Sequence, residues 1–171
     1  MPIKHTTIGS WAVIIAKALN SYGHDGEACC KEFGVDLQAA RDPHTRYSTE
    51  LMSPLWSYAA KLSGDPLFGL HAGTFVSPST FHALSLSMWM SGSLYEALRS
   101  LVKFGRVFST AGVTRLSEED GKVLFSVDFQ RDNKAEMVVT RHAQEASASA
   151  ILSLCRSLYG VGFKPLKVEV I

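Results

Sequence analysis

The sequence lacks the short motifs that mark most catalytic and membrane-spanning chains. It contains no metal-binding HExxH spacing, no GxSxG nucleophile turn, and neither of the phosphate-binding motifs GxxxxGK[ST] and GxGxxG. No apolar run approaches the roughly 18 residues that a membrane-spanning helix needs, and the N-terminus does not resemble a secretory signal. These absences predict a chain that is not an enzyme, uses no cofactor or metal and has no membrane partner.

An excess of charge of one sign is also missing. The 17 Lys and Arg residues oppose 16 Asp and Glu residues, which gives a formal net charge of +1. Domains that bind nucleic acid by themselves usually carry a basic excess gathered on one face. We therefore expect this chain alone to bind DNA or RNA poorly.

Cysteine is scarce, and its pattern indicates free thiols. Cys29, Cys30 and Cys155 cannot all pair, and a bridge between the two adjacent residues would be strained. Reduced thiols in a cytoplasmic protein fit best. A thiol sensor or a metal site at Cys29-Cys30 is an alternative, but there is no CxxC spacing and Lys31 is the only nearby cation, so a role as small apolar residues is favoured. An enzyme that uses a cysteine or histidine is the corresponding functional alternative.

The chain has 171 residues, 46% apolar and 19% charged, which is enough to form one domain with a buried core. Apolar spacing and capping residues predict helices at 10–22, 26–33, 48–62, 65–72, 79–90, 93–108 and 134–159, and a mostly irregular segment at 35–47. In the third helix, Pro54 falls in the tolerated first turn if that helix begins near Ser53.

Alternating apolar and polar residues predict strands at 113–116 and 123–129, joined by a turn at Glu119-Asp120-Gly121, and a last strand at 166–171. The fold class is therefore α+β, mostly helical, with a small antiparallel sheet made of a hairpin and a C-terminal strand. A domain rarely ends on a strand that could be paired further, so we expect more chain after Ile171.

Aromatic and Met residues gather on the apolar faces of the helices between residues 64 and 108. Such side chains bury large areas and adapt to the shape of a ligand, so they line cavities well. An ordinary hydrophobic core is the alternative. We predict a ligand pocket, with His82 as its polar partner, formed by Phe75, Phe81, His82, Met88, Trp89 and Phe104.

Three stretches carry a resemblance to a known family: Gly64–Leu70, Phe81–Leu84, and Ser93 through Leu101 to Phe104. They are similar to the N-terminal effector domain of AraC-type bacterial transcription regulators, closest to the branch of ornithine-utilisation and quorum-sensing-modulator regulators. The segment 42–56, the acidic hairpin and the segment 164–168 fit as well, so the resemblance covers nearly the whole chain.

The resemblance implies a cytoplasmic bacterial regulator in which residues 1–171 bind a small effector or mediate dimerisation. A C-terminal pair of helix-turn-helix motifs would bind the promoter, and it is absent from this sequence. The family's effector domain also usually continues with another helix and strand, which implies truncation here. The expected partners are thus an unidentified small molecule, a second copy of the chain, and DNA only through the missing domain. A ligand-free protein-interaction module, pairing through the edge of the last strand, is the alternative.

Overall fold

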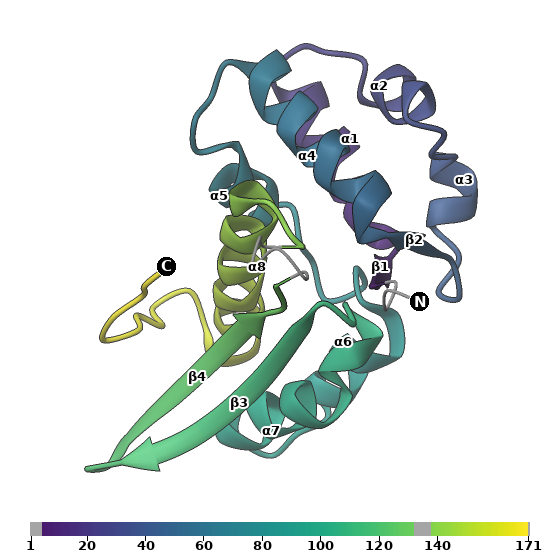
Figure 1. The fold of residues 1–171 in the computed structure, drawn as a ribbon. Helices are drawn as coiled ribbons and strands as arrows, with labels where there is room; N and C mark the ends of the chain where they lie inside the picture. The colour runs from purple at the N-terminus through teal and green to yellow at the C-terminus, as the bar shows by residue number, and fades with distance from the viewer. Residues whose placement is uncertain (1–4, 132–137, 171) are drawn as a thin grey trace.

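The computed structural model describes residues 5–131 and 138–170, and its α+β architecture confirms the predicted fold class (Figure 1). No helix in these residues is long and apolar enough to cross a membrane. The elements follow the order β1 (Thr6–Ile8), α1 (Ser10–Ser21), α2 (Gly26–Glu32), α3 (Leu37–Ala40), β2 (Arg46–Ser48), α4 (Thr49–Ser63), α5 (Phe68–Gly73), α6 (His82–Trp89), α7 (Leu94–Phe104), a 3-10 turn (Gly105–Val107), β3 (Gly112–Glu119), β4 (Lys122–Phe129) and α8 (Arg141–Tyr159).

Polar side chains cap the longer helices where the sequence places them. The Ser48 hydroxyl accepts from the Leu51 amide at the start of α4, and the Ser93 hydroxyl accepts from the Glu96 amide at the start of α7. Each cap satisfies an N–H group that has no partner inside the helix. The Glu96 carboxylate in turn accepts from the Gly92 amide, which completes the predicted pairing at this helix start.

Pro54 lies in the interior of α4, because the helix begins at Thr49 and not near Ser53. The first-turn position expected for this proline is therefore wrong. Proline has no N–H group to offer the Glu50 carbonyl one turn earlier. Both residues are exposed, so water can bind that carbonyl and the helix continues through the proline.

Several helix ends differ from the prediction by a turn. Helices α5 and α6 begin three residues later than expected, at Phe68 and His82, and α7 gives way to the 3-10 turn after Phe104. The last helix begins at Arg141, where the Thr140 side chain caps it. The sequence predicted an earlier start, at residue 134. Residues 138–140 are not helical, and residues 134–137 lie outside the described residues.

The β3–β4 hairpin has the predicted position and turn. The strands pair antiparallel from Gly112 with Phe129 to Glu119 with Lys122. Asp120 and Gly121 form the two-residue turn with φ of 51° and 70°. Positive φ at both central residues matches the twist of the flanking strands, and an Asp-Gly pair adopts it readily.

The C-terminal strand predicted at 166–171 is wrong for the part that can be assessed. Residues 166–170 are exposed and form no strand, while Ile171 lies outside the described residues. An alternating pattern produces a strand only where a neighbouring strand supplies hydrogen bonds, and none lies beside this segment in the described structure. Two elements absent from the prediction do form: α3, capped by Asp36, and the β1–β2 pair.

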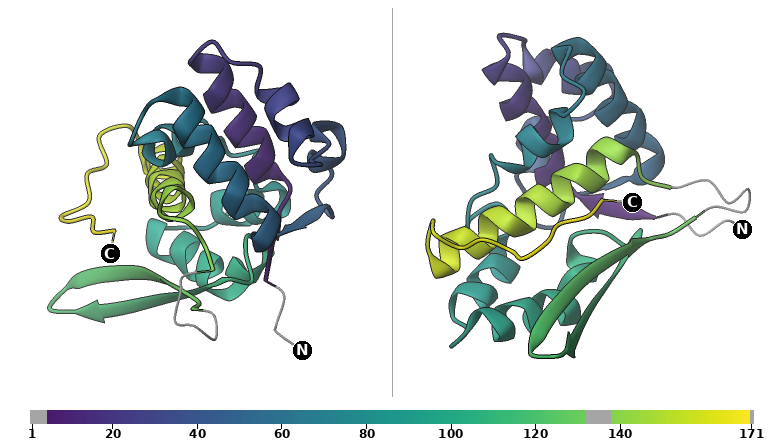
Figure 2. Two further views of the ribbon diagram at one scale, coloured as in Figure 1. Left: turned by 45° about the horizontal axis from the view of Figure 1, so that its top comes forward. Right: turned by 90° about the vertical axis from the view of Figure 1, so that its left-hand side faces the viewer.

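The elements form two layers with α8 between them. Helices α1 to α4 make the upper layer in Figure 1, and α6, α7 and the hairpin make the lower layer; both further views agree (Figure 2). Five aromatic side chains cross this division in a continuous series of ring contacts 4.1 to 6.1 Å between centroids, running through Phe68, Trp56, Trp11, Phe81 and Phe108. These rings form the centre of the core.

The α5–α8 contact depends on two glycines spaced four residues apart. A Cβ atom added to Gly69 would lie 2.2 Å from the His142 carbonyl oxygen, and one added to Gly73 would lie 2.4 Å from the Ser149 Cβ. No real Cβ approaches so closely, so only glycine lets the two backbones meet here. Hydroxyls add to the contact, since Ser149 donates to the Leu70 carbonyl at 2.7 Å.

Gly69→Ala should therefore destabilise the domain. Alanine favours a helix more than glycine does, but the new methyl group must push α8 away from α5. We expect the free energy of unfolding to fall by about 1–3 kcal/mol, measured by urea denaturation. Gly162→Ala is the control, because nothing lies within 4 Å of that position. Equal stability of the two variants would contradict the close approach.

Candidate functional site

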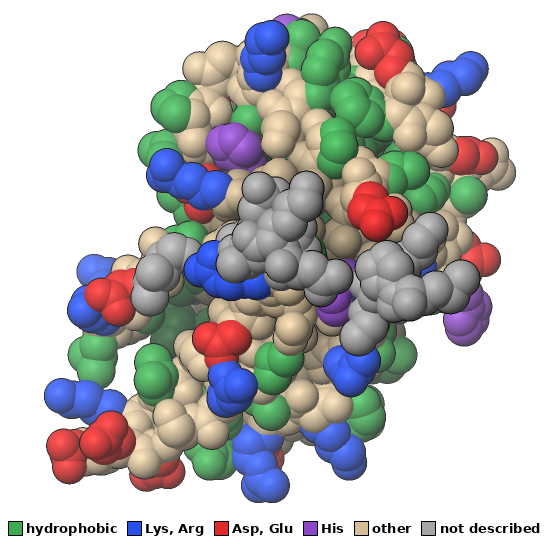
Figure 3. Space-filling view, viewed as in Figure 1, with side chains coloured by type: hydrophobic (Ala, Val, Ile, Leu, Met, Phe, Trp, Pro, Cys, Tyr) green, Lys and Arg blue, Asp and Glu red, His purple; other side chains and the backbone are tan. Residues whose placement is uncertain are grey.

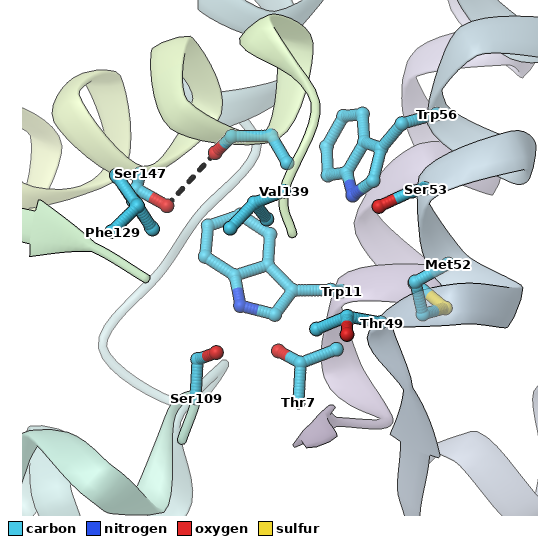
Figure 4. Close-up of a pocket in the computed structure, with 11 residues that line it drawn as sticks. Thr7, Trp11, Thr49, Met52, Ser53, Trp56, Ser109, Phe129, Val139 and Ser147 are labelled. Atoms are coloured by element: carbon cyan, nitrogen blue, oxygen red, sulfur yellow. Dashed lines mark hydrogen bonds between the residues drawn. The ribbon is translucent and has the colours of Figure 1, made fainter. Parts of the chain in front are cut away.

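A small cavity lies where the two layers and α8 meet (Figure 4). Its volume is ≈ 30 Å³, and about 10–15 Å³ of such space holds one water molecule. We call it the junction cavity. Its lining residues are Thr7, Trp11, Thr49, Met52, Ser53, Trp56, Ser109, Phe129, Val139, Ala143 and Ser147.

Helix geometry explains why α4 contributes more lining residues than any other element. Thr49, Met52, Ser53 and Trp56 follow one another at intervals of three, one and three residues, so they share one face of the helix. Ala143 and Ser147 lie four residues apart and form one face of α8 in the same way. Helices thus supply seven of the eleven lining residues, and the others come from β1, β4 and the irregular positions Ser109 and Val139.

Two buried indoles form the core-facing wall. The rings of Trp11 and Trp56 meet edge to face, with centroids 6.0 Å apart, and the ring of Phe81 packs on Trp11 at 5.3 Å. Both tryptophans are less than a tenth exposed. Aromatic rings in this arrangement pack favourably beyond the area that they bury, so this wall is rigid.

The remaining wall is uncharged and combines hydroxyls with the apolar side chains of Met52, Phe129, Val139 and Ala143. The hydroxyls of Thr7 and Ser147 donate to the carbonyls of Phe108 and Ala143, each at 2.9 Å, and the Ser53 hydroxyl donates to Val138 at 3.3 Å. A hydroxyl that donates in this way keeps lone pairs as acceptors. No Lys, Arg, Asp or Glu is among the described lining residues. The cavity therefore suits a neutral molecule that carries hydrogen-bond donors.

The structure does not bring the six predicted pocket residues together around one cavity. Phe81 and Met88 are buried in the core, Phe75 is half-buried, and Trp89 and Phe104 are 61% and 44% exposed. His82 lines a separate groove beside α1. Ligand binding by these residues stays a prediction.

Thiol and metal chemistry find little support in the described residues. No group of three or more His, Cys, Asp or Glu side chains is placed to hold a metal ion there. All three cysteines are buried and free. Burial raises the pKa of Cys30 to about 12 and that of Cys155 to about 11, and it also raises the pKa of Cys29, with Glu32 adding to the effect. Such thiols are protonated and unreactive near neutral pH.

Comparison with known proteins adds the family. The model of the N-terminal arabinose-binding domain of AraC transcription regulators matches residues 23–170. The chain belongs to this family. A search of curated proteins finds no match to this AraC-type domain. The resemblance seen in the sequence is thus confirmed at the level of the family.

Sequence reasoning missed the tryptophans of the junction cavity. Trp11 lies near the start of α1 and Trp56 lies in α4, both outside the 64–108 region in which the pocket was expected. A signal was present: Trp56 shares its helix face with Thr49 and Ser53, so an aromatic face that also carries hydroxyls could have been recognised from the spacing.

The AraC-type domain should protect all three thiols from modification. At pH 8 we expect Cys155 to react with DTNB roughly 100-fold more slowly than in the unfolded chain, since a pKa of about 11 in place of 9.0 lowers its thiolate fraction by that factor. Cys30 should react more slowly still, and the raised pKa of Cys29 should slow that thiol as well. Because folding raises these pKa values, the stability gained from the neutral thiols is complete below pH 9 and is lost as pH rises toward 11–12. Fast reaction of one native thiol at pH 7 would instead support cysteine-dependent chemistry.

Proposed function

We propose that this AraC-type domain senses a small effector and thereby controls promoter binding by a C-terminal helix-turn-helix domain of the full regulator. Its role is regulatory rather than catalytic. The observation that carries the proposal is the position of the junction cavity, whose wall draws on α1 and α4 of the upper layer, on α8, and on Phe129 of the lower layer. A ligand at this place contacts residues of both layers and of α8.

The size of the cavity defines the mechanism. A space of ≈ 30 Å³ admits a water molecule or two and no sugar or amino acid. An effector therefore binds a more open arrangement, in which α4 and α8 stand further apart. Because it binds that arrangement better than the closed one, it shifts the population toward it. The attached DNA-binding domain would respond to this shift.

The lining indicates the class of effector. Indole faces and apolar side chains suit the non-polar surface of a ligand, and the hydroxyls of Thr49, Ser53 and Ser147 suit its donors. A neutral polyhydroxylated molecule, such as the sugar for which the family is named, matches this chemistry better than a charged one. On the sequence resemblance we place the chain in the branch of ornithine-utilisation and quorum-sensing-modulator regulators, as a cytoplasmic bacterial homodimer.

The near-neutral net charge of the chain supports the assignment of DNA binding to a separate domain. On the face in Figure 3, basic and acidic side chains are intermixed, and the hairpin itself carries an Arg115–Asp128 ion pair. This face has no continuous basic field of the kind that tracks a phosphate backbone.

A ligand-free interaction module is the second candidate. Leu86, Trp89 and Met90 at the end of α6 are 57%, 61% and 79% exposed. Apolar side chains gathered on one exposed element are typical of a protein-binding surface. Under this candidate, α6 would contact another protein and the junction cavity would stay closed.

A thermal-shift screen of sugars, amino acids, fatty acids and quorum signals tests the sensor directly. We expect at least one compound to raise the melting temperature in a saturable way, since any ligand that binds only the folded state stabilises it. In the Trp89→Phe variant, the remaining indoles are Trp11 and Trp56, so binding at the junction cavity should change the tryptophan emission.

Two substitutions on α8 locate the site. Ser147→Leu fills the junction cavity and should abolish the response, whereas Ser157→Leu changes an exposed serine with a similar backbone hydrogen bond outside the cavity and should preserve it. Thr49→Val removes a lining hydroxyl with little change of shape, and it serves if Ser147→Leu does not fold. Stabilisation by no compound would favour the interaction module, and equal responses in all variants would move the site elsewhere.

A further inference from the structure

A groove between the two layers, distinct from the junction cavity, has no role in the proposed mechanism. Its volume is ≈ 160 Å³ and it is open to solvent. It is formed by α1, the end of α3, the loop before α6 and the first residue of α6. The lining residues are Ser10, Val13, Ile14, Lys17, Arg41, Ser77, Ser79, Thr80 and His82.

The four α1 residues of the groove follow helical spacing and so form one continuous face. Ser10 and Lys17 stand two turns apart at its ends, with Val13 and Ile14 between them. The adjacent residue, Trp11, belongs to the wall of the junction cavity. One helix therefore serves both hollows with different faces.

The charge of the groove is entirely positive. Lys17 and Arg41 are exposed, and no hydrogen bond or ion pair joins either side chain to another residue in the described part of the chain. The lining contains no Asp or Glu. Most surface cations lie near a carboxylate, so two unpaired cations facing one hollow leave a local excess of positive potential.

Hydroxyl groups also line the groove. The Ser77 hydroxyl lies 3.0 Å from that of Ser79 and 3.1 Å from that of Thr80, and the Ser10 hydroxyl lies 3.3 Å from Nε2 of His82. These groups can donate to an oxygen atom held between them and the two cations.

His82 is held in an unusual conformation. Its φ is 51°, one of only two positive values at described non-glycine residues, and the other occurs in the hairpin turn. Such a backbone is energetically unfavourable and persists only where the surroundings enforce it. Here it accompanies the orientation that places the imidazole in the groove beside Ser10.

We propose that this groove binds a small molecule through its oxyanion group, a carboxylate or a phosphate. Lys17 and Arg41 would bind the anionic oxygens, the hydroxyls of the Ser77–Thr80 loop would donate to them, and Val13 with Ile14 would contact the short apolar part. A guanidinium and an ammonium converging with several hydroxyls form strong charge-assisted hydrogen bonds to such a group. The size and concave shape of the groove suit a small ligand rather than a nucleic-acid backbone.

The site does not depend on the sensor proposal. It would still connect the layers, because α1 and α3 belong to the upper layer and the Ser77–His82 segment leads into the lower one. An anion bound between them stabilises their present arrangement by mass action. It would therefore oppose any effector that favours a more open arrangement.

Titration of the ¹⁵N-labelled protein with inorganic phosphate, and separately with acetate, tests the site at constant ionic strength against chloride. We expect saturable amide shifts at Ser10, Lys17 and the Ser77–His82 segment, and the tighter of the two anions identifies the preferred group. The Lys17→Ala, Arg41→Ala double variant should weaken binding at least about tenfold, as the loss of charge-assisted bonds requires. Both residues are exposed, so the variant should fold.

The control is the Lys31→Ala, Arg99→Ala double variant, which removes the same charges from exposed positions outside the groove. It should bind either anion as the unmodified protein does. Two results would overturn the proposal: the absence of saturable shifts at the groove with both anions, or equal weakening by the control. Neither result bears on the response to neutral sugars in the thermal-shift screen, which the Ser147→Leu variant assigns to the junction cavity, so the two proposals fail separately.

Discussion

The contact between α5 and α8 is the constraint on which the arrangement of the domain depends. At Gly69 and Gly73 the two helices approach so closely that a single methyl group has no room. This contact sets the height and direction of α8, which the two layers enclose from either side. Ala143 and Ser147 consequently face α4 across the junction cavity. The position of the cavity is thus a consequence of the missing side chains at Gly69 and Gly73, which follow the start of α4 by some twenty residues in the sequence.

The aromatic series through Trp11 is the second constraint on where the cavity lies. Its rings fill the space between the layers near α1, whereas the region beside α8 is lined by small residues and hydroxyls. The rigid wall of aromatic rings therefore faces a wall of smaller side chains that can adapt. The region around Phe81, where the sequence predicted an enclosed space, is instead filled by contacts with Trp11 and Phe108, at 5.3 and 4.1 Å between ring centroids. The remaining space lies on the other side of Trp11, in the junction cavity between α4 and α8.

Local signals explain what could be predicted from the sequence. Capping serines at 48 and 93 and the Asp120-Gly121 turn act within a few residues, so the helices and the hairpin were expected where they occur. The β1–β2 pair joins three-residue strands from distant parts of the chain, and Arg46 of β2 secures it by donating to the Thr6 hydroxyl of β1 at 2.9 Å. Arg46 also donates to the Val107 carbonyl at 2.7 Å, which ties the pair to the 3-10 turn. No local pattern indicates such a contact. The junction cavity could not be predicted for the same reason, because Trp11, Trp56 and Ser147 become neighbours only through tertiary packing.

Under the two proposals, ligands at the junction cavity and at the groove favour different arrangements of the two layers, so the domain is not rigid. An occupied junction cavity requires α4 and α8 to separate, since ≈ 30 Å³ holds no effector in the present arrangement. The groove beside Lys17 spans the same layers on another face of α1 and is complete as it stands, at ≈ 160 Å³. Ligands that prefer different arrangements of one fold necessarily weaken each other's binding, and by equal factors. The Ser10–His82 contact, which joins α1 to α6 at the groove, is therefore the place where one hollow would sense the state of the other.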